Sequence, residues 1–172
     1  LLRAASKAHS ELVVVHIDAH TDTYRGYGNQ DYMRYNVATT FTRAAEEALI
    51  DVESSIHVGA RGPTNDSGVF NHTRDVGYGL IDGTELFNAG LRNTAKNIVE
   101  SLKGRSVYLC FDMDFFDPSC APGVCTPTWG GATSREGLDF LQNLTGLNLV
   151  GADINTVSPP HDISGMTAFC LL

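Results

Sequence analysis

The chain has 172 residues, of which 42% are hydrophobic and 19% are charged, and its formal net charge at pH 7 is -8. This length suffices for one domain with a sizeable core, and the negative charge argues against nucleic acids and anionic membranes as partners. No apolar run approaches the roughly 20 residues that span a bilayer, and residues 1–10 lack the basic region and apolar core of a signal peptide. These features predict a cytoplasmic protein.

Apolar runs and turn-forming residues alternate along the chain. Helices are expected at residues 1–10, 36–49, 84–103 and 133–144, with a last one beginning near 165. Strands are expected at 12–18, 55–59, 80–81, 105–112 and 147–153, and polar loops at 24–35 and 61–75. The run at 12–18 is rich in Val and Ile, which suits a parallel strand covered on both faces. The alternation of strands and helices predicts an α/β fold with a mainly parallel sheet.

Two clusters of acidic residues stand at the ends of predicted strands. Asp18, His20 and Asp22 follow the first apolar run, and Asp112 and Asp114 follow the fourth. Residues two apart on an extended segment point to the same side, and ligands bind at the carboxyl ends of strands in such sheets. Buried carboxylates this close together would repel one another unless cations neutralised them. The two clusters therefore predict a two-metal site.

Other histidines, cysteines and one arginine receive less specific interpretations. His16 lies on the same side of its strand as Asp18, as either a core residue or one that supports a metal ligand. His57, His72 and His161 are expected at the surface or in packing. Cys110 is expected to be a reduced, buried thiol, since the four cysteines lack close paired spacing. Arg61 is expected to be structural or to lie at an oligomer contact.

Several segments resemble the motifs of the ureohydrolases, the family of arginase and agmatinase. They are VHIDAHTD at 15–22, FDMDFFDP at 111–118, GGATSRE at 130–136 and GADINTVSPPHD at 151–162, in the family's order. The resemblance implies a three-layer α/β/α fold that is incomplete at both ends of this chain. It implies one catalytic domain over residues 1–172, without its N-terminal and C-terminal portions, and a homo-oligomer, either a trimer or a hexamer.

The resemblance also implies roles for the acidic residues. Asp18 and Asp112 would bridge two divalent metal ions, Asp22 would bind one ion, and His20 and Asp114 would bind the other. A histidine upstream of this chain would complete the first ion's ligands. Oxygen ligands with one imidazole suit Mn²⁺ best, and Ni²⁺ or Co²⁺ are the alternatives.

The expected chemistry is hydrolysis of a guanidino compound to urea, or a substituted urea, and an amine or ammonia. Two metal ions about 3.5–4 Å apart lower the pKa of a water that bridges them from about 15.7 towards 7, and so provide a metal-bridging hydroxide. Asp18 and Asp112 are catalytic through this bridge, and Asp117 is expected to support the site or to relay protons. The partner is a small guanidino substrate.

Two positions depart from the family pattern, and both belong to the predicted substrate pocket. Thr156 stands where arginases and agmatinases carry a glutamate that binds the guanidinium, and the loop at Asn36 and Val37 lacks the expected histidine. A charge-assisted hydrogen bond contributes roughly 1.5–3 kcal/mol, so these changes favour a guanidine other than arginine or agmatine. They leave open a catalytically weak, metal-binding paralogue that acts as a structural subunit. A single-zinc deacetylase-like amidohydrolase is a third possibility, which the two-metal pattern disfavours.

Overall fold

The structure, a computed structural model, describes residues 1–26 and 33–169. The predicted loop at 24–35 and the cysteine at 170 therefore lie partly or wholly outside the described residues. In chain order, with η for 3₁₀ helices, the elements are α1 (Leu2–Ala8), β1 (Val13–Ile17), η2 (Val37–Thr39), α2 (Thr40–Glu46), β2 (Ile56–Val58), α3 (Val69–Val76), β3 (Gly79–Ile81), α4 (Gly83–Ala89), α5 (Leu91–Ser101), β4 (Ser106–Asp112), η3 (Met113–Phe115), α6 (Ser134–Asn143), β5 (Asn148–Asn155), η4 (Pro159–His161), η5 (Ile163–Gly165) and α7 (Met166–Phe169).

The five strands form one sheet in the order β3-β2-β1-β4-β5, and every neighbouring pair is parallel. β1 and β4 lie side by side, with Ile17 paired to Phe111. Asp112 is the last residue of β4, and Asp18 directly follows β1. The two acidic segments therefore leave the sheet next to each other, as the sequence predicted.

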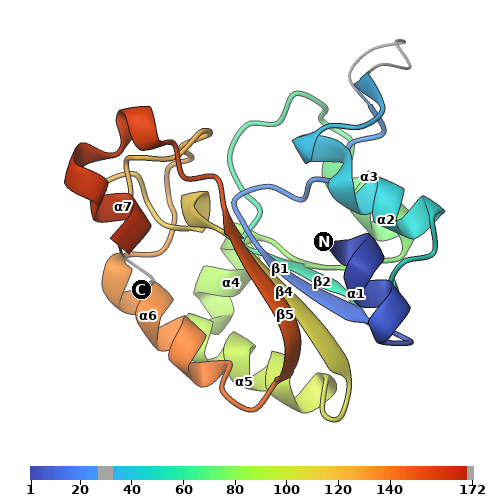
Figure 1. Ribbon diagram of the computed structural model, residues 1–172. Helices are drawn as coiled ribbons and strands as arrows, with labels where there is room; N and C mark the ends of the chain where they lie inside the picture. The colour runs from blue at the N-terminus through green and yellow to red at the C-terminus, as the bar shows by residue number, and fades with distance from the viewer. Residues whose placement is uncertain (27–32, 170–172) are drawn as a thin grey trace.

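Helices cover both faces of the sheet (Figure 1), with α4, α5 and α6 on one side and α1, α2 and α3 on the other. Alternate residues of β1 pack against the helices on opposite faces of the sheet. Val13 and Val15 pack in the core that contains Leu86 of α4, whereas Val14 packs in the core that contains Phe41 of α2. All five side chains are almost fully buried, and each buried aliphatic side chain contributes roughly 1.5–3 kcal/mol to stability. The predicted α/β fold is confirmed.

Two sequence-based expectations for the helices were wrong. The helix expected at 84–103 is two helices, α4 and α5, separated at Gly90, whose backbone (φ 83°, ψ 130°) interrupts the helix. The loop expected at 61–75 contains α3 in its second half, because the turn-forming residues end at Gly68. Val69 and Thr73 then lie one helical turn apart and are both buried.

The starts of two other helices follow their sequence signals. Thr133 and Glu136 form the predicted capping box of α6, with the Glu136 N–H donating to Thr133 Oγ1 at 3.3 Å and the Thr133 N–H donating to Glu136 Oε2 at 2.9 Å. The helix expected at 36–49 begins as η2, which Asn36 caps, and ends earlier with α2. In the part of the chain that the structure describes, no helix has the length and apolar character needed to cross a bilayer.

Candidate metal and substrate site

The segment after β1 turns sharply, and it does not continue as a strand. Asp18 Oδ1 accepts a hydrogen bond from the His20 N–H at 2.8 Å, which folds the chain back over the end of β1. Asp22 has a positive φ of 49°, an uncommon conformation for a residue with a side chain. The expected clustering occurs, but turns produce it, and the alternation of side chains along a strand does not.

A chain of buried hydroxyls holds the unusual backbone at Asp22. Thr21 Oγ1 and Thr23 Oγ1 are 2.8 Å apart, and Thr23 Oγ1 and Thr73 Oγ1 are 2.5 Å apart. Thr73 of α3 in turn donates to the carbonyl of Val69 at 2.8 Å. The residues on both sides of Asp22 are thus anchored to α3, a helix that the sequence did not predict.

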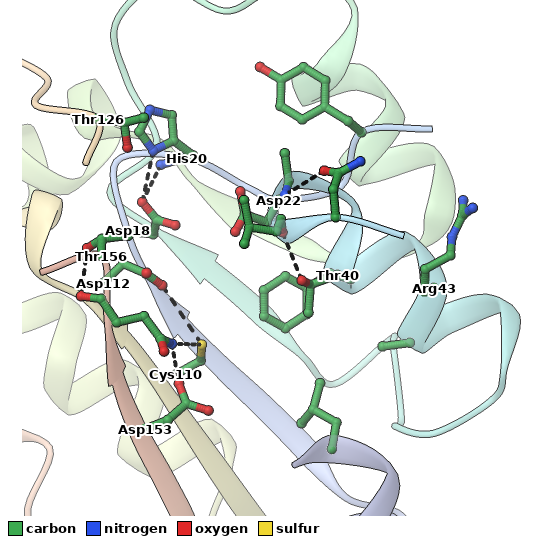
Figure 2. A pocket seen from close by; sticks show the side chains of 18 of the residues that line it. Asp18, His20, Asp22, Thr40, Arg43, Cys110, Asp112, Thr126, Asp153 and Thr156 are labelled. Carbon is green, nitrogen blue, oxygen red and sulfur yellow. Dashed lines mark hydrogen bonds and ion pairs between the residues drawn. The ribbon is translucent and has the colours of Figure 1, made fainter. Parts of the chain in front are cut away.

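The five predicted metal ligands lie together. Ligand atoms of Asp18, His20 and Asp114 all lie within 4.8 Å of one another. His20 turns Nδ1 towards both carboxylates, 3.2 Å from Asp18 Oδ1 and 3.3 Å from Asp114 Oδ2. Asp22 forms a second such group with Asp18 and His16, and Asp112 a third with His16 and Cys110. Figure 2 shows Asp18, His20, Asp22 and Asp112 around the cavity.

The acidic groups of the cluster have strongly perturbed pKa values. Burial, followed by the charge of Asp18, raises the pKa of Asp22 to about 8, and burial raises the pKa of Asp114 to about 6. Burial also raises the pKa of Asp112. Burial would likewise raise the pKa of Asp18, but hydrogen bonds from His16 and His20 lower it below its usual value. Four carboxylates in such surroundings favour bound positive charge.

The pKa of His20, which lies beside these carboxylates, is also perturbed. Burial would lower the pKa of His20, but its hydrogen bonds with Asp114 and Asp18 raise it to about 10. Hard carboxylate oxygens with one imidazole form a donor set that fits divalent ions such as Mn²⁺. The residues present therefore suit the two-metal site that their sequence pattern indicates.

The carboxylates of Asp18, Asp22 and Asp112 border a cavity of about 970 Å³. Asn36, Val37 and Thr156, the predicted substrate-pocket residues, all line it. Val37 is 83% exposed, so an apolar side chain stands at the cavity wall where a histidine was expected. Asn36 is engaged in capping η2, since its Oδ1 accepts from the Ala38 N–H at 3.0 Å.

The hydroxyl of Thr156 is bound to the main chain. It accepts a hydrogen bond from the Met113 N–H at 2.8 Å and donates one to the Asn155 carbonyl at 2.7 Å. Thr156 itself has a positive φ of 66°, and its carbonyl accepts from the Cys125 N–H at 2.9 Å. Thr156 therefore fixes the junction of β5 and η3, and it supplies no charge to the cavity.

Asp117 lies in a different place from the other predicted catalytic residues. Its carboxylate accepts backbone N–H bonds from Ser119 at 3.0 Å, Gly130 at 2.9 Å and Gly131 at 3.4 Å. A hydrogen bond from the Ser119 side chain, followed by these backbone bonds, lowers the pKa of Asp117 to about 2. It borders a small surface depression beside Trp129. This placement favours a role in shaping the loop and does not favour proton relay.

Arg61 organises the same loop from its other side. Its Nη2 donates to the carbonyls of Asp114 and Thr128, each at 2.8 Å, and its Nε donates to the carbonyl of Trp129 at 3.2 Å. A Cβ at Gly131 would stand 2.4 Å from this Nη2 and 2.6 Å from the carbonyl oxygen of Phe115, so the loop needs glycine there. Arg61 has the structural role that the sequence suggested.

Sequence reasoning missed a polar network next to Asp112, on β4 and β5 (Figure 2). Asp153 of β5 accepts hydrogen bonds from Tyr108 OH at 2.6 Å and from Asn155 Nδ2 at 2.5 Å. Cys110 lies between this pair and Asp112, with its Sγ 3.5 Å from Asn155 Nδ2 and 3.9 Å from Asp112 Oδ2. Polar residues at alternate positions of the two predicted strands were the available signal.

The described cysteines are free thiols, as expected, but Cys110 is only partly buried, because it borders the cavity. Cys110 is a free thiol, and burial together with the charge of Asp112 raises its pKa. Cys120 and Cys125 are free as well.

Comparisons with known proteins agree with this geometry. The sequence model of one protein family, described as "Arginase family", matches residues 1–171 of this chain. Guanidinobutyrase from Pseudomonas aeruginosa is 35% identical over 170 residues, which cover 98% of this chain and 52% of the relative. Agmatinase from Proteus mirabilis is 37% identical over 168 residues, covering 98% of this chain and 51% of that protein. The solved proclavaminate amidino hydrolase from Streptomyces clavuligerus is 37% identical with a TM-score of 0.88, covering 98% of this chain and 55% of its own. The chain spans about half the length of the curated relatives it matches.

Proposed function

This chain belongs to the arginase family, and from the site that it carries we propose that the protein hydrolyses a guanidino compound. The products are urea, or a substituted urea, and an amine or ammonia. The observation that carries the proposal is the convergence of four carboxylates and one imidazole at one cavity: Asp18, His20, Asp22 and Asp112 line it, and Asp114 is bound to His20 behind them.

The proposed cofactor is a pair of divalent ions, with Mn²⁺ favoured by the oxygen-rich donor set. Asp18 and Asp112 are the proposed ligands of both ions. Asp22 would bind one ion, and His20 and Asp114 would bind the other. When bound, such a pair lowers the pKa of water towards neutrality and so supplies a nucleophile for a poorly electrophilic guanidinium carbon.

Residues of the chain keep the ligands in place. The Thr126 hydroxyl donates to Asp114 Oδ2 at 2.7 Å, and the Ala19 N–H lies 3.4 Å from Asp114 Oδ1. Asp114 is fully buried, so these bonds and the contact with His20 fix its orientation. A ligand held in this way needs little rearrangement when an ion binds.

The proposed substrate is a small guanidine other than arginine or agmatine. The Thr156 hydroxyl is already bound to Met113 and Asn155, and Val37 is apolar. Neither side chain can oppose a guanidinium charge, and the Asp153 carboxylate on the cavity wall is already bound to Tyr108 and Asn155. The cavity is therefore proposed to hold its substrate by shape, by neutral hydrogen bonds and by the ions. A guanidinobutyrase and an agmatinase match this chain at similar identity, so the comparisons do not favour either substrate.

The test is a urea-release assay on the full-length protein, after reconstitution with Mn²⁺ and separately with Ni²⁺. Arginine, agmatine, guanidinobutyrate, methylguanidine and guanidine are compared by kcat/KM, with metal content measured on the same samples. The proposal expects bound metal, urea release, and the highest kcat/KM for a small guanidine. A highest value for arginine or agmatine would refute the substrate assignment. Absence of urea from every guanidine, with the ions bound, would refute the reaction.

A non-catalytic, metal-binding subunit was the competing hypothesis, motivated by Val37 and Thr156. The comparisons lend it no support, because the matching relatives are named as hydrolases.

A further inference from the structure

A row of polar side chains crosses the sheet just below the acidic cluster. The strand register aligns His57 of β2 with His16 of β1, His16 with Cys110 of β4, and Cys110 with Asp153 of β5. Aligned residues of neighbouring strands project from the same face of a sheet. Cys110 and Asp153 line the cavity, whereas His16 and His57 do not, and the proposed function gives His57 no role.

His16 connects this row to the two proposed bridging ligands. Its Nε2 lies 3.1 Å from Asp18 Oδ2 and also 3.1 Å from Asp112 Oδ2. Ionised carboxylates only accept hydrogen bonds, so Nε2 must carry a proton to bind them. One N–H group thus lies between the carboxylates of Asp18 and Asp112, and its direction depends on the orientation of the His16 ring.

His57 holds the other side of that ring. The Nδ1 atoms of His16 and His57 are 2.8 Å apart, a distance that requires a proton on one of them. Both side chains are almost completely buried, so water does not compete for this bond. The bond is the same length whichever nitrogen donates, and it fixes the same ring orientation in either case.

The other nitrogen of His57 has no comparable contact. Among the described residues, none provides a hydrogen-bond partner for His57 Nε2. The rings of Phe41 and Tyr78 pack edge-on against His57, with centroid distances of 5.0 and 4.8 Å. An apolar side chain would fill such a site without leaving a buried nitrogen unpaired. The bond to His16 is therefore the polar contact that distinguishes histidine from a packing residue here.

We propose that His57 is a positioning residue: its Nδ1 bond orients the ring of His16, so that the His16 Nε2–H holds the carboxylates of Asp18 and Asp112 in the geometry that binds divalent ions. The inference rests on the proposed metal centre and goes beyond it. His57 touches neither substrate nor ion and acts through His16 alone.

The test uses His57→Asn and His57→Leu in the full-length protein. These two side chains have nearly the same size and shape, but the asparagine amide places a hydrogen-bonding atom where histidine has Nδ1, and leucine places a methyl group there. Both variants lose the same ring packing against Phe41 and Tyr78. Any difference between them therefore reports the bond to His16.

The readout is the dissociation constant for Mn²⁺, measured from the electron paramagnetic resonance signal of the free ion. We expect His57→Leu to weaken Mn²⁺ binding about tenfold, the lower end of the loss caused by removing a partner of a metal ligand, because His57 acts one contact further away, through His16. His57→Asn should stay within about threefold of the wild type. His72→Asn and His72→Leu are the matched control, because the ring nitrogens of His72 have no partner among the described residues. This pair should leave Mn²⁺ affinity unchanged.

Equal Mn²⁺ affinity in His57→Asn and His57→Leu would overturn the inference, and so would a wild-type protein that binds no Mn²⁺. Urea release is measured separately. A wild type that binds Mn²⁺ but releases no urea would contradict the proposed reaction, while the comparison of Asn with Leu would still decide the role of His57.

Discussion

Replacing Asp112 by Asn should separate metal binding from folding. Asp112 is 4% exposed, and its Oδ2 lies 3.1 Å from His16 Nε2. Burial raises its pKa, so the folded state binds this proton more tightly than the unfolded state does. Stability is therefore lost as the pH rises above the unfolded-state pKa of this carboxyl. The neutral amide of Asp112→Asn removes this cost, and we expect the metal-free variant to be at least as stable as the wild type at pH 7.

When Mn²⁺ is present, the wild type should instead be more stable than Asp112→Asn. An ion at one hundred times its dissociation constant stabilises the folded state by about 2.7 kcal/mol. Mutation of a residue that contacts a metal ligand lowers metal affinity by up to about a hundredfold. We take the same hundredfold loss for Asp112→Asn, which is a modest estimate because a ligand itself is lost. It leaves about 0.4 kcal/mol at the same ion concentration. The variant should therefore lose about 2.3 kcal/mol of metal-dependent stability, a difference of several degrees in Tm.

The assay is calorimetric unfolding of the full-length protein with EDTA and then with Mn²⁺, alongside urea release. Asp117→Asn is the matched control, because this carboxylate binds loop backbone and borders a different surface depression. It should lower Tm without changing the increase in Tm that Mn²⁺ causes. An Asp112→Asn protein with near-normal turnover and a full Mn²⁺-dependent increase in Tm would rule out the bridging role.

Three further outcomes are expected in the full-length protein. Thr156→Glu should weaken the native guanidine activity, measured by urea release, and stronger activity would contradict the reasoning. It should also cost about 1–3 kcal/mol of stability in denaturant unfolding, because the Met113 N–H loses its acceptor. Thr73→Val should cost about 1 kcal/mol and weaken Mn²⁺ binding, because the hydroxyl chain of Thr21 and Thr23 loses its anchor on α3; metal titration tests this, and unchanged affinity would speak against it. Without metal, stability should fall as the pH rises from about 4 to about 8, since the pKa of Asp22 is raised to about 8 in the fold; a pH series of urea unfolding in EDTA, and again with Mn²⁺, should show this slope only in EDTA.

The sequence predicted the sheet because its signal is local. The apolar run that contains Val13 and Val15 has only one reasonable position, in the middle of a covered parallel sheet. The acidic residues directly after such strands must then meet at the carboxyl edge. The clustering of Asp18 with Asp114 was predictable for this reason, although the assumed strand geometry was wrong.

Features that depend on tertiary contacts escaped prediction. The contact between His57 and His16 depends on the register of β2 against β1, which neither strand specifies alone. The positive φ of Asp22 depends on a hydroxyl of α3, fifty residues later in the chain. The loop position of Asp117 depends on the backbone N–H groups of residues 130 and 131. Each is a long-range hydrogen bond that sequence spacing does not reveal.

The contacts of Arg61 have a consequence for how this site can change during evolution. The hydrogen bonds of its guanidinium go to main-chain carbonyls, among them those of Thr128 and Trp129. Carbonyl groups are present whatever side chain a residue carries, so mutations at 128 and 129 leave these anchor points intact. Thr128 lines the cavity and Trp129 is 84% exposed, so new side chains there would meet substrate or solvent. The loop can therefore acquire a different specificity while the path of its backbone past Asp114 is maintained.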